Sequence, residues 1–304
     1  MPADRIYNFL EPDERLSFEE IYRIAKLFVQ QGVRKLRITG GEPLLRRNLA
    51  DLIARLASIK GVEDISLTTN GYLLKDQAYD LKEAGLNRVT VSLDTIDPEI
   101  FQRMSGRNVK LQKILDGINE ANNVGLKPIK INAVVQKKVN CYKILEFAEY
   151  FKNLGHTVRF IEFMDVGNQN NWDMKFVVSS KHLLEKIEKK FHVEALEPSY
   201  FGEVASRYRY KDNGVEFGFI SSVTQPFCGS CTRARLSTDG KVYTCLFASE
   251  GTDLKPLIRS NCTDAKLADE IANIWQKRND RYSERRSAMT NSETQKVEMF
   301  HIGG

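Results

Sequence analysis

The sequence predicts an α/β protein whose parallel strands form either a doubly wound sheet or a barrel. Helical patterns alternate with short β-branched runs from residue 17 to residue 163, and parallel strands need helical crossovers of this kind. The 304 residues, 42% apolar and 28% charged, have the composition of an ordinary globular protein. After residue 200 the strands become shorter and are separated by glycine turns. We therefore expect a large region over residues 1–222 and a smaller one over residues 223–304.

Local signals place the individual elements in chain order. Ser17 and Glu20 form a capping box that starts an amphipathic helix, and Gly32 ends it. Glycine turns at residues 212–214 and 238–240 predict two hairpins, and residues 264–279 predict a charged helix. Between them, strands separated by helical segments are expected at Lys35 to Thr39, Ile65 to Thr68, Val89 to Leu93, Ile129 to Val135 and Val158 to Phe163.

Charge and cysteine content restrict the function classes. The net charge of +5, from 45 basic and 40 acidic residues, suits a small anionic ligand. No long basic run is present, so no nucleic-acid partner is expected. The sequence has no apolar signal segment and no run near the roughly 18 apolar residues of a membrane helix, so we expect a cytoplasmic protein without membrane association. An odd count of five cysteines favours free thiols or metal ligands over disulfides.

The spacing Cys228-x2-Cys231-x13-Cys245 is the strongest local signal. A Cys-x2-Cys turn presents two sulfur atoms together, and a hairpin can return the third, so metal binding is expected. Spacing alone leaves three alternatives open. Cys262 could complete a four-ligand zinc site, three thiolates could hold a [4Fe-4S] cluster with one open iron, or the pair could be a redox dithiol. Cys141, in a predicted helix, is interpreted as a plain buried thiol.

Several basic residues lie where a phosphate could meet them. Arg233 and Arg235, two residues apart on a predicted strand, would point to one side beside the cysteines and could hold a polyphosphate; the alternative is a solvated charged face. Arg37, Lys130 and Arg159 lie inside strands that otherwise look buried. A polyanionic ligand would partner them, unless each faces solvent or pairs with a carboxylate.

Polar and glycine-rich segments follow four of the predicted strands. These segments are Gly40-Gly41-Glu42-Pro43, Thr68-Thr69-Asn70-Gly71, Ser92-Leu93-Asp94 and residues 163–168. The carboxyl ends of parallel strands meet at one rim, where ligands bind, so one shared site is expected there. Each segment by itself is also explained by turn chemistry.

Taken together, these motifs and the terminal Gly303-Gly304 resemble the GTP 3',8-cyclase family of molybdenum cofactor biosynthesis over essentially the whole chain. That family consists of radical S-adenosylmethionine enzymes. The resemblance implies an incomplete TIM-like (βα) barrel of the radical S-adenosylmethionine type, with the first strand missing, plus a small C-terminal iron-sulfur domain. It also implies radical cyclisation of GTP to (8S)-3',8-cyclo-7,8-dihydroguanosine 5'-triphosphate.

The resemblance further implies roles for individual residues. The ligands of a [4Fe-4S] cluster that meets the guanine would be Cys228, Cys231 and Cys245. The contacts to GTP would come from Arg37, Thr68, Lys130, Arg233, Ala234 and Arg235. Contacts to S-adenosylmethionine would come from Gly41, Ser92 and Met164, and the terminal glycines resemble the tail that reaches the family's active site.

One family motif does not occur in the 304 residues. A Cys-x3-Cys-x2-Cys motif holds the second [4Fe-4S] cluster expected of this family, and it closes just before a Met-Pro pair like Met1-Pro2. We expect an upstream segment to supply this motif, the first strand and a further arginine for GTP, and we expect no S-adenosylmethionine cleavage by the 304 residues alone. The alternatives are an inactive or truncated GTP-binding iron-sulfur paralogue and a zinc-stabilised structural protein. Family partners would be a second copy in a homodimer and, downstream, cyclic pyranopterin monophosphate synthase.

Overall fold

The computed structural model describes residues 10–106, 109–167, 170–285 and 296–303. Its main sheet has the strand order β1-β2-β3-β4-β5-β8-β7-β6, parallel from β1 through β5 to β8 and antiparallel at β7 and β6. The strands are β1 (Lys35–Ile38), β2 (Asp64–Thr69), β3 (Arg88–Ser92), β4 (Lys130–Val135), β5 (Thr157–Glu162), β6 (Val193–Leu196), β7 (Ser206–Tyr210) and β8 (Glu216–Ile220). A second sheet contains β9 (Arg235–Leu236), β10 (Lys241–Tyr243) and β11 (Thr252–Asp253).

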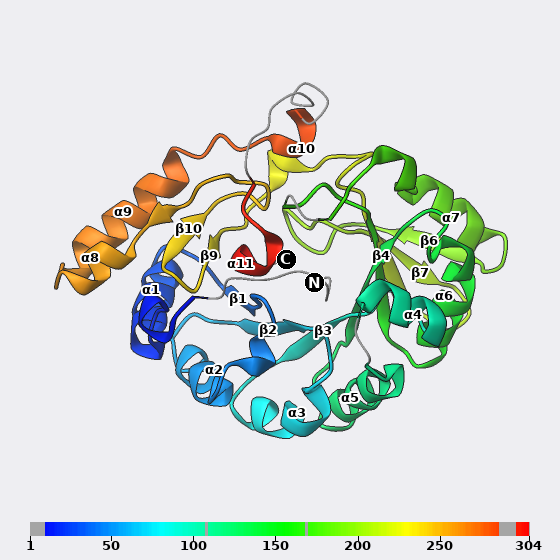
Figure 1. The fold of residues 1–304 in the computed structure, drawn as a ribbon, viewed down its shortest axis with the longest axis horizontal. Coiled ribbons are helices and arrows are strands. Elements are labelled where there is room, and N and C mark those ends of the chain that lie inside the picture. The colour runs from blue at the N-terminus through cyan, green and yellow to red at the C-terminus, as the bar shows by residue number, and fades with distance from the viewer. Residues whose placement is uncertain (1–9, 107–108, 168–169, 286–295, 304) are drawn as a thin grey trace.

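The main sheet curves into a partial barrel with helices on its outer side, as Figure 1 shows. The first helices are α1 (Phe18–Gln30), α2 (Leu49–Ala57), α3 (Leu74–Glu83), α4 (Pro98–Ser105), α5 (Leu111–Asn123), α6 (Ile144–Asn153) and α7 (Ser180–Glu188). The later ones are α8 (Lys255–Arg259), α9 (Asp264–Gln276), α10 (Tyr282–Arg285) and α11 (Met299–Ile302). The short helix α11 lies inside the ring of strands, near β1 and β9 (Figure 1).

The elements predicted from local signals are confirmed. The strands β1 to β5 agree with the predicted runs to within a residue or two. The Ser17 hydroxyl accepts a hydrogen bond from the Glu20 amide, and the Glu20 carboxylate accepts one from the Ser17 amide, at 3.2 Å and 2.7 Å. The two glycine turns join β7 to β8 and β9 to β10 as hairpins. The parallel order of β1 to β5 confirms the α/β prediction and the barrel-like arrangement.

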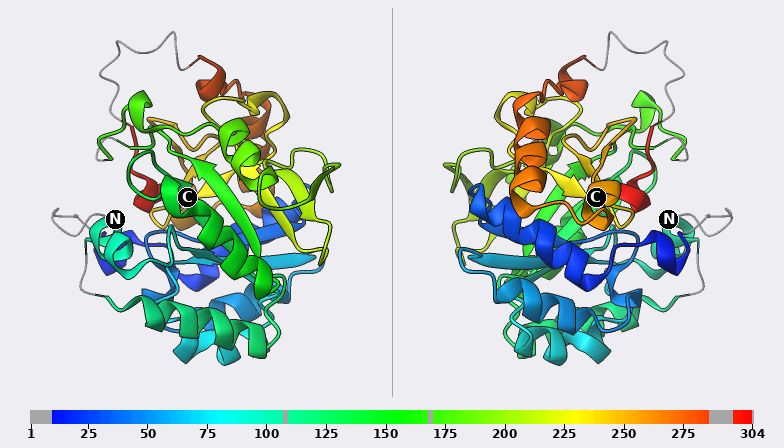
Figure 2. Two further views of the ribbon diagram at one scale, coloured as in Figure 1. Left: turned by 90° about the vertical axis from the view of Figure 1, so that its right-hand side faces the viewer. Right: turned by 90° about the vertical axis from the view of Figure 1, so that its left-hand side faces the viewer.

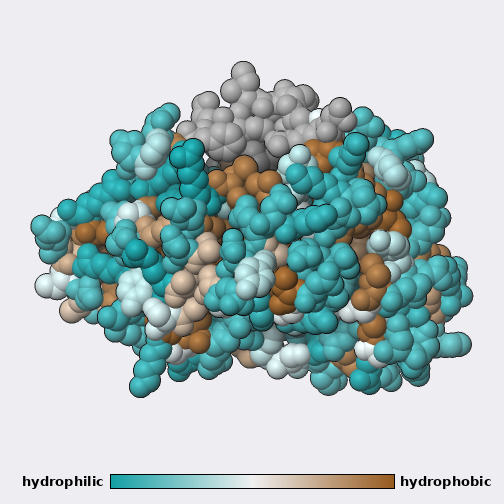
Figure 3. All heavy atoms as spheres, turned by 90° about the horizontal axis from the view of Figure 1, so that it is seen from below, coloured by the Kyte–Doolittle hydropathy of each residue, from teal (hydrophilic) through white to brown (hydrophobic). Residues whose placement is uncertain are grey.

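Side chains alternate between two faces of the barrel strands, as they do in any strand. The outward face is apolar and buried under the helices: Leu67, Val91, Ile131 and Phe160 have no exposed surface. The opposite, inward face of the same strands is polar. Covering helices turn their polar sides to solvent, so the face in Figure 3 is mainly hydrophilic with separate hydrophobic patches. Within the described residues, no helix has the length and apolar character needed to cross a bilayer.

A second, smaller core attaches the C-terminal part of the chain to the barrel. Ile24 and Leu27 of α1 pack there with Val242, Ile258 and Leu267 from β10, α8 and α9. Figure 2 shows α8 and α9, in orange, lying along the blue helix α1. Helix α1 also packs against the main core, so it joins both parts of the molecule.

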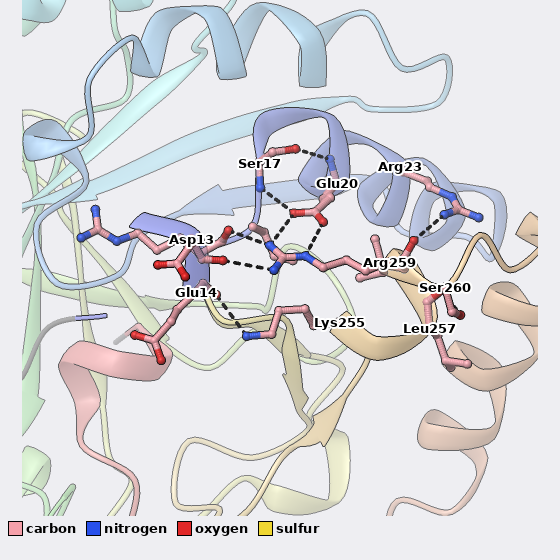
Figure 4. A network of polar contacts seen from close by, with 12 residues as sticks. Asp13, Glu14, Ser17, Glu20, Arg23, Lys255, Leu257, Arg259 and Ser260 are labelled. Carbon is pink, nitrogen blue, oxygen red and sulfur yellow. Dashed lines mark hydrogen bonds and ion pairs between the residues drawn. The ribbon is translucent and has the colours of Figure 1, made fainter. Parts of the chain in front are cut away.

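A polar network surrounds this second core at the start of α1 (Figure 4). Arg259 donates to the Glu20 carboxylate at 2.9 Å and to the Asp13 carbonyl at 3.1 Å. Arg23 of α1 donates to the Asp264 carboxylate of α9 at 2.8 Å. The Arg259 guanidinium thus links the start of α1 and the segment before it to α8. These contacts hold the C-terminal part of the chain against α1.

Replacing Arg259 with alanine is expected to lower the urea midpoint of unfolding, because the network at the start of α1 loses several contacts at once. Arg55→Ala is a matched control, since Arg55 also pairs with a glutamate of α1, Glu19, but makes a single exposed ion pair at 2.9 Å. Such a pair contributes little. Equal midpoints for the two variants in urea titrations would contradict a structural role for the network.

Candidate functional site

The inward face of the barrel presents rows of polar side chains across neighbouring strands. The strand register sets these rows. One row is Arg37, Ser66 and Arg88; the next is Thr68, Thr90 and Lys130; the third is Ser92, Asn132 and Arg159. A polar lumen with an apolar outer face is the reverse of a packed barrel interior, where bulky apolar side chains fill the space. This lumen is therefore a candidate ligand site.

The lumen is strongly cationic. Burial, then Arg159 and Arg88, lower the pKa of Arg37 to about 10, and burial with Arg159, Arg88 and Arg37 lowers the pKa of Lys130 to about 7. Burial is also the main cause that lowers the pKa of Arg159, which is only 8% exposed. Arg37 keeps accessible surface while protein surrounds it, as expected of a side chain on the wall of an open cavity.

Among the described residues, two cations of the inward face pair with carboxylates: Arg88 with Asp64, and Arg207 of β7 with Glu216. Arg88 donates to Asp64 through two hydrogen bonds of 2.6 Å and 2.7 Å. For Arg37, Lys130 and Arg159, the described part of the chain supplies no ion pair. Unpaired cations held close together in a partly buried space repel one another. A polyanion in the lumen would remove this repulsion.

Three neutral polar atoms of the lumen also have unused hydrogen-bonding capacity. The hydroxyl oxygens of Thr68 and Thr90 and the side-chain carbonyl oxygen of Asn132 are buried without a partner in the part of the chain that the structure describes. Buried polar groups usually have partners, and exceptions concentrate at functional sites. These atoms lie in the same two rows as Lys130 and Arg159.

The three cysteines of the predicted metal site lie in one neighbourhood. Cys228 and Cys231 lie at a 3-10 turn (Cys228–Ser230), and Cys245 follows β10. Burial, together with the nearby thiol of Cys228, raises the pKa of Cys245. Within the described ranges, however, no three His, Cys, Asp or Glu side chains form a closed metal-ligand group. The cluster site therefore stays a prediction, based on donor chemistry and proximity.

One arginine favours the thiolate form of this site. The Arg233 guanidinium donates to the Cys231 sulfur at 3.0 Å and 3.3 Å. Burial alone would raise the pKa of Cys231, but Arg233 and then Arg278 outweigh it and lower the pKa. Thiolates are the form that binds metals. Cys262 lies elsewhere, packed on the second core, and its carbonyl accepts from Arg23.

The cations of the lumen continue into the cysteine region. Arg233 contributes to the lowered pKa of Arg37 across the barrel, and burial with Arg233 lowers the pKa of Arg235 to about 10. Arg235 in turn lies near the thiols of Cys231 and Cys245, which oppose that shift. The structure thus brings together the basic residues and the cysteines that the sequence predicted as separate signals.

The rim above the lumen carries the predicted contacts to S-adenosylmethionine. Gly41, Ser92 and Met164 lie at the carboxyl ends of β1, β3 and β5. The Glu42 carboxylate links the segment after β1 to the end of β2. It accepts hydrogen bonds from the Thr69 hydroxyl at 2.7 Å and from the backbone amide of residue 70 at 2.8 Å. The strand ends are thereby held side by side around an open mouth.

Some polar residues at strand ends serve the fold itself. Asp94 accepts from the Val134 amide at 2.8 Å, and burial raises the pKa of its carboxyl to about 6. Asn140 donates to the Asp94 carbonyl, which ties the ends of β3 and β4 together. Asn70 accepts from the Tyr72 amide in an Asx turn. Turn chemistry therefore explains Asn70, whereas Asp94 joins the end of β3 to β4. Asn168, Gly304 and Met1-Pro2 lie outside the described residues.

The C-terminal segment enters the mouth of the lumen. The Gly303 carbonyl accepts a hydrogen bond from Arg235 at 3.2 Å. Gly303 has φ +70°, and a Cβ atom there would collide with the Thr39 methyl group at the end of β1. A Cβ on Gly41 would lie 3.8 Å from the Phe300 carbonyl. The close approach of the tail to Thr39 therefore requires glycine at position 303, whereas the space beside Gly41 would accept a Cβ atom.

Sequence reasoning missed part of the lumen. Arg88, Thr90 and Asn132 were not singled out, although they share rows with predicted residues. The available signal was the alternation inside the strands, where Arg88, Thr90 and Ser92 of β3 and the first and third residues of β4 are polar. That alternation identifies a polar inner face once the other face is known to carry the helices.

Comparisons with known proteins agree with this geometry. Residues 4–151 match the Radical SAM superfamily, and residues 156–284 match Molybdenum Cofactor Synthesis C. The chain is 52% identical over 301 residues to a GTP 3',8-cyclase of Staphylococcus haemolyticus, and 52% identical over 299 residues to one of Staphylococcus aureus. These alignments cover 98% and 97% of this chain and 88% of each relative.

Solved structures with little sequence similarity share the fold. Streptococcus suis SuiB, bound to S-adenosylmethionine, matches with a TM-score of 0.57 at 16% identity, over 80% of this chain and 55% of that one. A tagged anSMEcpe with bound AdoMet matches with a TM-score of 0.52 at 18% identity, over 80% of this chain and 65% of that one. The chain therefore spans less than two thirds of either structure, and the likeness concerns the fold alone.

Proposed function

The chain belongs to the GTP 3',8-cyclase family, radical S-adenosylmethionine enzymes of molybdenum cofactor biosynthesis, and on that premise we propose that its cationic lumen binds GTP. Its function is that of a GTP cyclase in this pathway. The main support for placing GTP in the lumen is a series of neighbouring cations. This series runs from Lys130 through Arg159 and Arg37 to Arg233 and Arg235.

The triphosphate and the guanine would occupy opposite ends of this series. Arginine forks meet phosphate oxygens through paired hydrogen bonds, so Arg37, Lys130 and Arg159 would hold the triphosphate. Thr68, whose buried hydroxyl has unused capacity, would add a neutral hydrogen bond. The guanine would then lie toward the cysteines. The run Arg233, Ala234 and Arg235 would contact the nucleotide there, since it follows the cysteine turn directly.

The cysteine turn fits a [4Fe-4S] cluster held by three thiolates. Cys228, Cys231 and Cys245 would be its ligands. Cys262 belongs to the second core, which leaves three thiols for the site. A structural zinc site would need a fourth ligand, so this donor set favours a cluster with one open iron for substrate. The protein would hold the nucleotide within reach, and Arg233, which lowers the pKa of Cys231, would favour the thiolate form.

Family membership implies S-adenosylmethionine and a [4Fe-4S] cluster, whose chemistry supplies the radical that starts the reaction. We propose that Gly41, Ser92 and Met164, at the rim, contact S-adenosylmethionine. The 304 residues contain cysteines at 141, 228, 231, 245 and 262, and so no Cys-x3-Cys-x2-Cys motif.

The binding part of the proposal is tested on the 304-residue chain. After anaerobic reconstitution with iron and sulfide, we expect about one [4Fe-4S] cluster and one GTP per chain, measured by iron and sulfide analysis and by calorimetry. Cys228→Ser should lose the cluster, whereas the control Cys262→Ser should keep it. Equal iron content in both variants, or bound zinc in place of iron, would refute the assignment of the cluster.

The catalytic part is tested on a form that carries the family's Cys-x3-Cys-x2-Cys segment ahead of residue 1. Incubated with GTP, S-adenosylmethionine and a reductant, this form is expected to give the cyclised nucleotide, detected by chromatography. The second candidate function is a GTP-binding iron-sulfur paralogue without radical chemistry. Tight GTP binding without product from the extended form would establish the second candidate and overturn the first.

Lys130 predicts a characteristic pH dependence of GTP affinity. Its pKa is about 7 in the free protein, and a bound polyphosphate would raise it toward the ordinary value, because an anion stabilises the ammonium form. Binding therefore takes up a proton above pH 7, and affinity should fall by up to about tenfold per pH unit as pH rises through 7. Calorimetric titrations between pH 6.5 and 9 measure this slope.

Lys130→Met separates this effect from the titration of the nucleotide itself. The variant should bind GTP more weakly at pH 6.5 and should show a flatter profile above pH 7. A profile with the same slope as that of the unaltered protein would show that another group is responsible.

Three further assignments are proposed from the family. The division at residue 222 falls between β8 and the cysteine turn, so residues 1–222 would form the barrel part and residues 223–304 the cluster- and GTP-binding part. We also propose a cytoplasmic protein that forms a homodimer. Its product would pass to cyclic pyranopterin monophosphate synthase.

A further inference from the structure

The C-terminal segment, residues 296–303, lies across the mouth of the lumen and is held at both ends. At its start, Lys296 donates to the Asp165 carboxylate at 2.8 Å and to the Asp165 carbonyl at 2.9 Å. At its end, the Gly303 carbonyl accepts from Arg235. Between these points the segment forms the single turn α11, which is too short to be stable by itself. Side-chain contacts must therefore hold the turn in place.

One contact of this turn is an ion pair with a different part of the molecule. The His301 Nε2 atom lies 3.3 Å from an Asp239 carboxylate oxygen, and the two side chains are 26% and 10% exposed. Asp239 belongs to the turn between β9 and β10. That turn is rigid, because the Ser237 hydroxyl also donates to Asp239 and the Leu254 amide donates to the Gly240 carbonyl at 2.9 Å.

The carboxylate of Asp239 is prepared for a cationic partner. Burial alone would raise the pKa of Asp239, but hydrogen bonds from His301 and Ser237, and the charge of Lys241 at 3.6 Å, hold it well below its usual range. The ionised form of the Asp239 carboxyl group is therefore favoured. Its charge draws His301, and with it α11, toward β9 and the lumen.

We propose that Asp239 and His301 are a positioning pair, which holds residues 299–303 in the mouth of the lumen beside Gly40 and Arg235. The pair touches neither the proposed GTP contacts nor the cysteines, and it acts through the backbone of the turn. Placement of the segment is a property of this chain with or without nucleotide. Its consequence for the reaction, the placing of Gly303 against Arg235, rests on the proposed function.

Amide hydrogen exchange of the C-terminal peptide tests the proposal on the full chain without any cofactor. The His301 amide donates to the Glu298 carbonyl and the Gly303 amide to the Met299 carbonyl, so both report directly on the turn. After correction for intrinsic rates, we expect these amides to exchange roughly three- to tenfold faster in Asp239→Asn and in His301→Gln than in the unaltered chain, the change expected when a partly exposed pair is lost.

Two variants separate the pair from general loss of structure. His301→Lys supplies a cationic side chain to Asp239, so it should keep the protection of the turn. Lys241→Met removes the other cation near Asp239, which lies on the hairpin itself, and should leave the protection unchanged. Protection that does not differ between Asp239→Asn and the unaltered chain would overturn the proposal, as would a His301→Lys variant that exchanges as fast as His301→Gln. GTP titration of the same variants tests the proposed function separately.

Discussion

Glu162→Ala is expected to lower the free energy of unfolding by about 3–5 kcal/mol, the range found when a buried, fully partnered charge network loses one member. Glu162, at the end of β5, is 1% exposed. Its carboxylate accepts from the amide and hydroxyl of Ser180 at 2.9 Å and 3.0 Å. It also accepts from the amides of Val223 and Thr224 at 3.0 Å and 2.8 Å, and from the Thr224 hydroxyl at 2.5 Å. Removal leaves these donors buried without an acceptor.

The effect should reach the cysteine site as well as the fold. Residues 223–224 lead directly to the turn that carries Cys228, so the carboxylate of Glu162 positions the start of that turn. Urea denaturation measures the stability loss, and iron content after reconstitution measures the effect on the cluster. Glu162→Gln should be intermediate, because one amide oxygen can still accept.

Glu146→Ala is the matched control for this prediction. Glu146 lies on α6 and makes one ion pair with Lys143, with 62% of its side chain exposed. Its removal should leave the urea midpoint unchanged within error. A Glu162→Ala variant as stable as this control would show that Val223 and Thr224 find other acceptors, and the structural role of Glu162 would be wrong.

Arg159→Met is expected to weaken GTP binding about 100-fold while leaving the nucleotide-free protein equally or more stable. Arg159 is 8% exposed, burial lowers its pKa, and within the described ranges no carboxylate pairs with it. An unpaired buried charge is unfavourable, so replacement by an apolar side chain of similar length removes a cost. The same replacement removes a phosphate ligand, and stability and binding should therefore change in opposite directions.

Thermal unfolding without nucleotide and calorimetric GTP titration measure the two effects. Arg209→Met provides the control, because Arg209 on β7 pairs with Glu194 and is 46% exposed. It should bind GTP as the unaltered protein does. If Arg159→Met loses stability but keeps its affinity, Arg159 is a structural residue and GTP does not bind against this part of the lumen.

Strand prediction succeeded where local chemistry alone decides the structure. The β-branched runs predicted as strands form β2, β3 and β4, and helices that the sequence also indicates bury one face of each. The hydrophobic period and the β-branched composition of these runs therefore both indicate strands. The capping box at Ser17 and the turn at residues 238–240 are equally local. Each of these signals lies within a few residues of the feature that it predicts.

The sequence indicates individual charged residues of the candidate site but not their arrangement. Lys130 and Arg159 were recognised as charges that need a partner, whereas Arg88, which has one in Asp64, was not singled out. Asp94 was expected at the ligand rim, but its carboxylate accepts from the Val134 amide and serves the sheet. Whether a polar side chain faces a ligand or a neighbouring backbone depends on strands that are distant in sequence.

The sequence by itself determined the alternation of strands and helices, the helix start at Ser17 and the presence of three cysteines beside two arginines. These features depend on hydrophobic periodicity, capping and spacing, which act over a few residues. Only the tertiary structure decided that the cations of β1, β4 and β5 face one lumen and that Cys262 lies elsewhere. It also decided that the C-terminal turn reaches Asp239. The physical reason is that strand register and sheet curvature bring together residues more than 100 positions apart, and no local pattern carries that information.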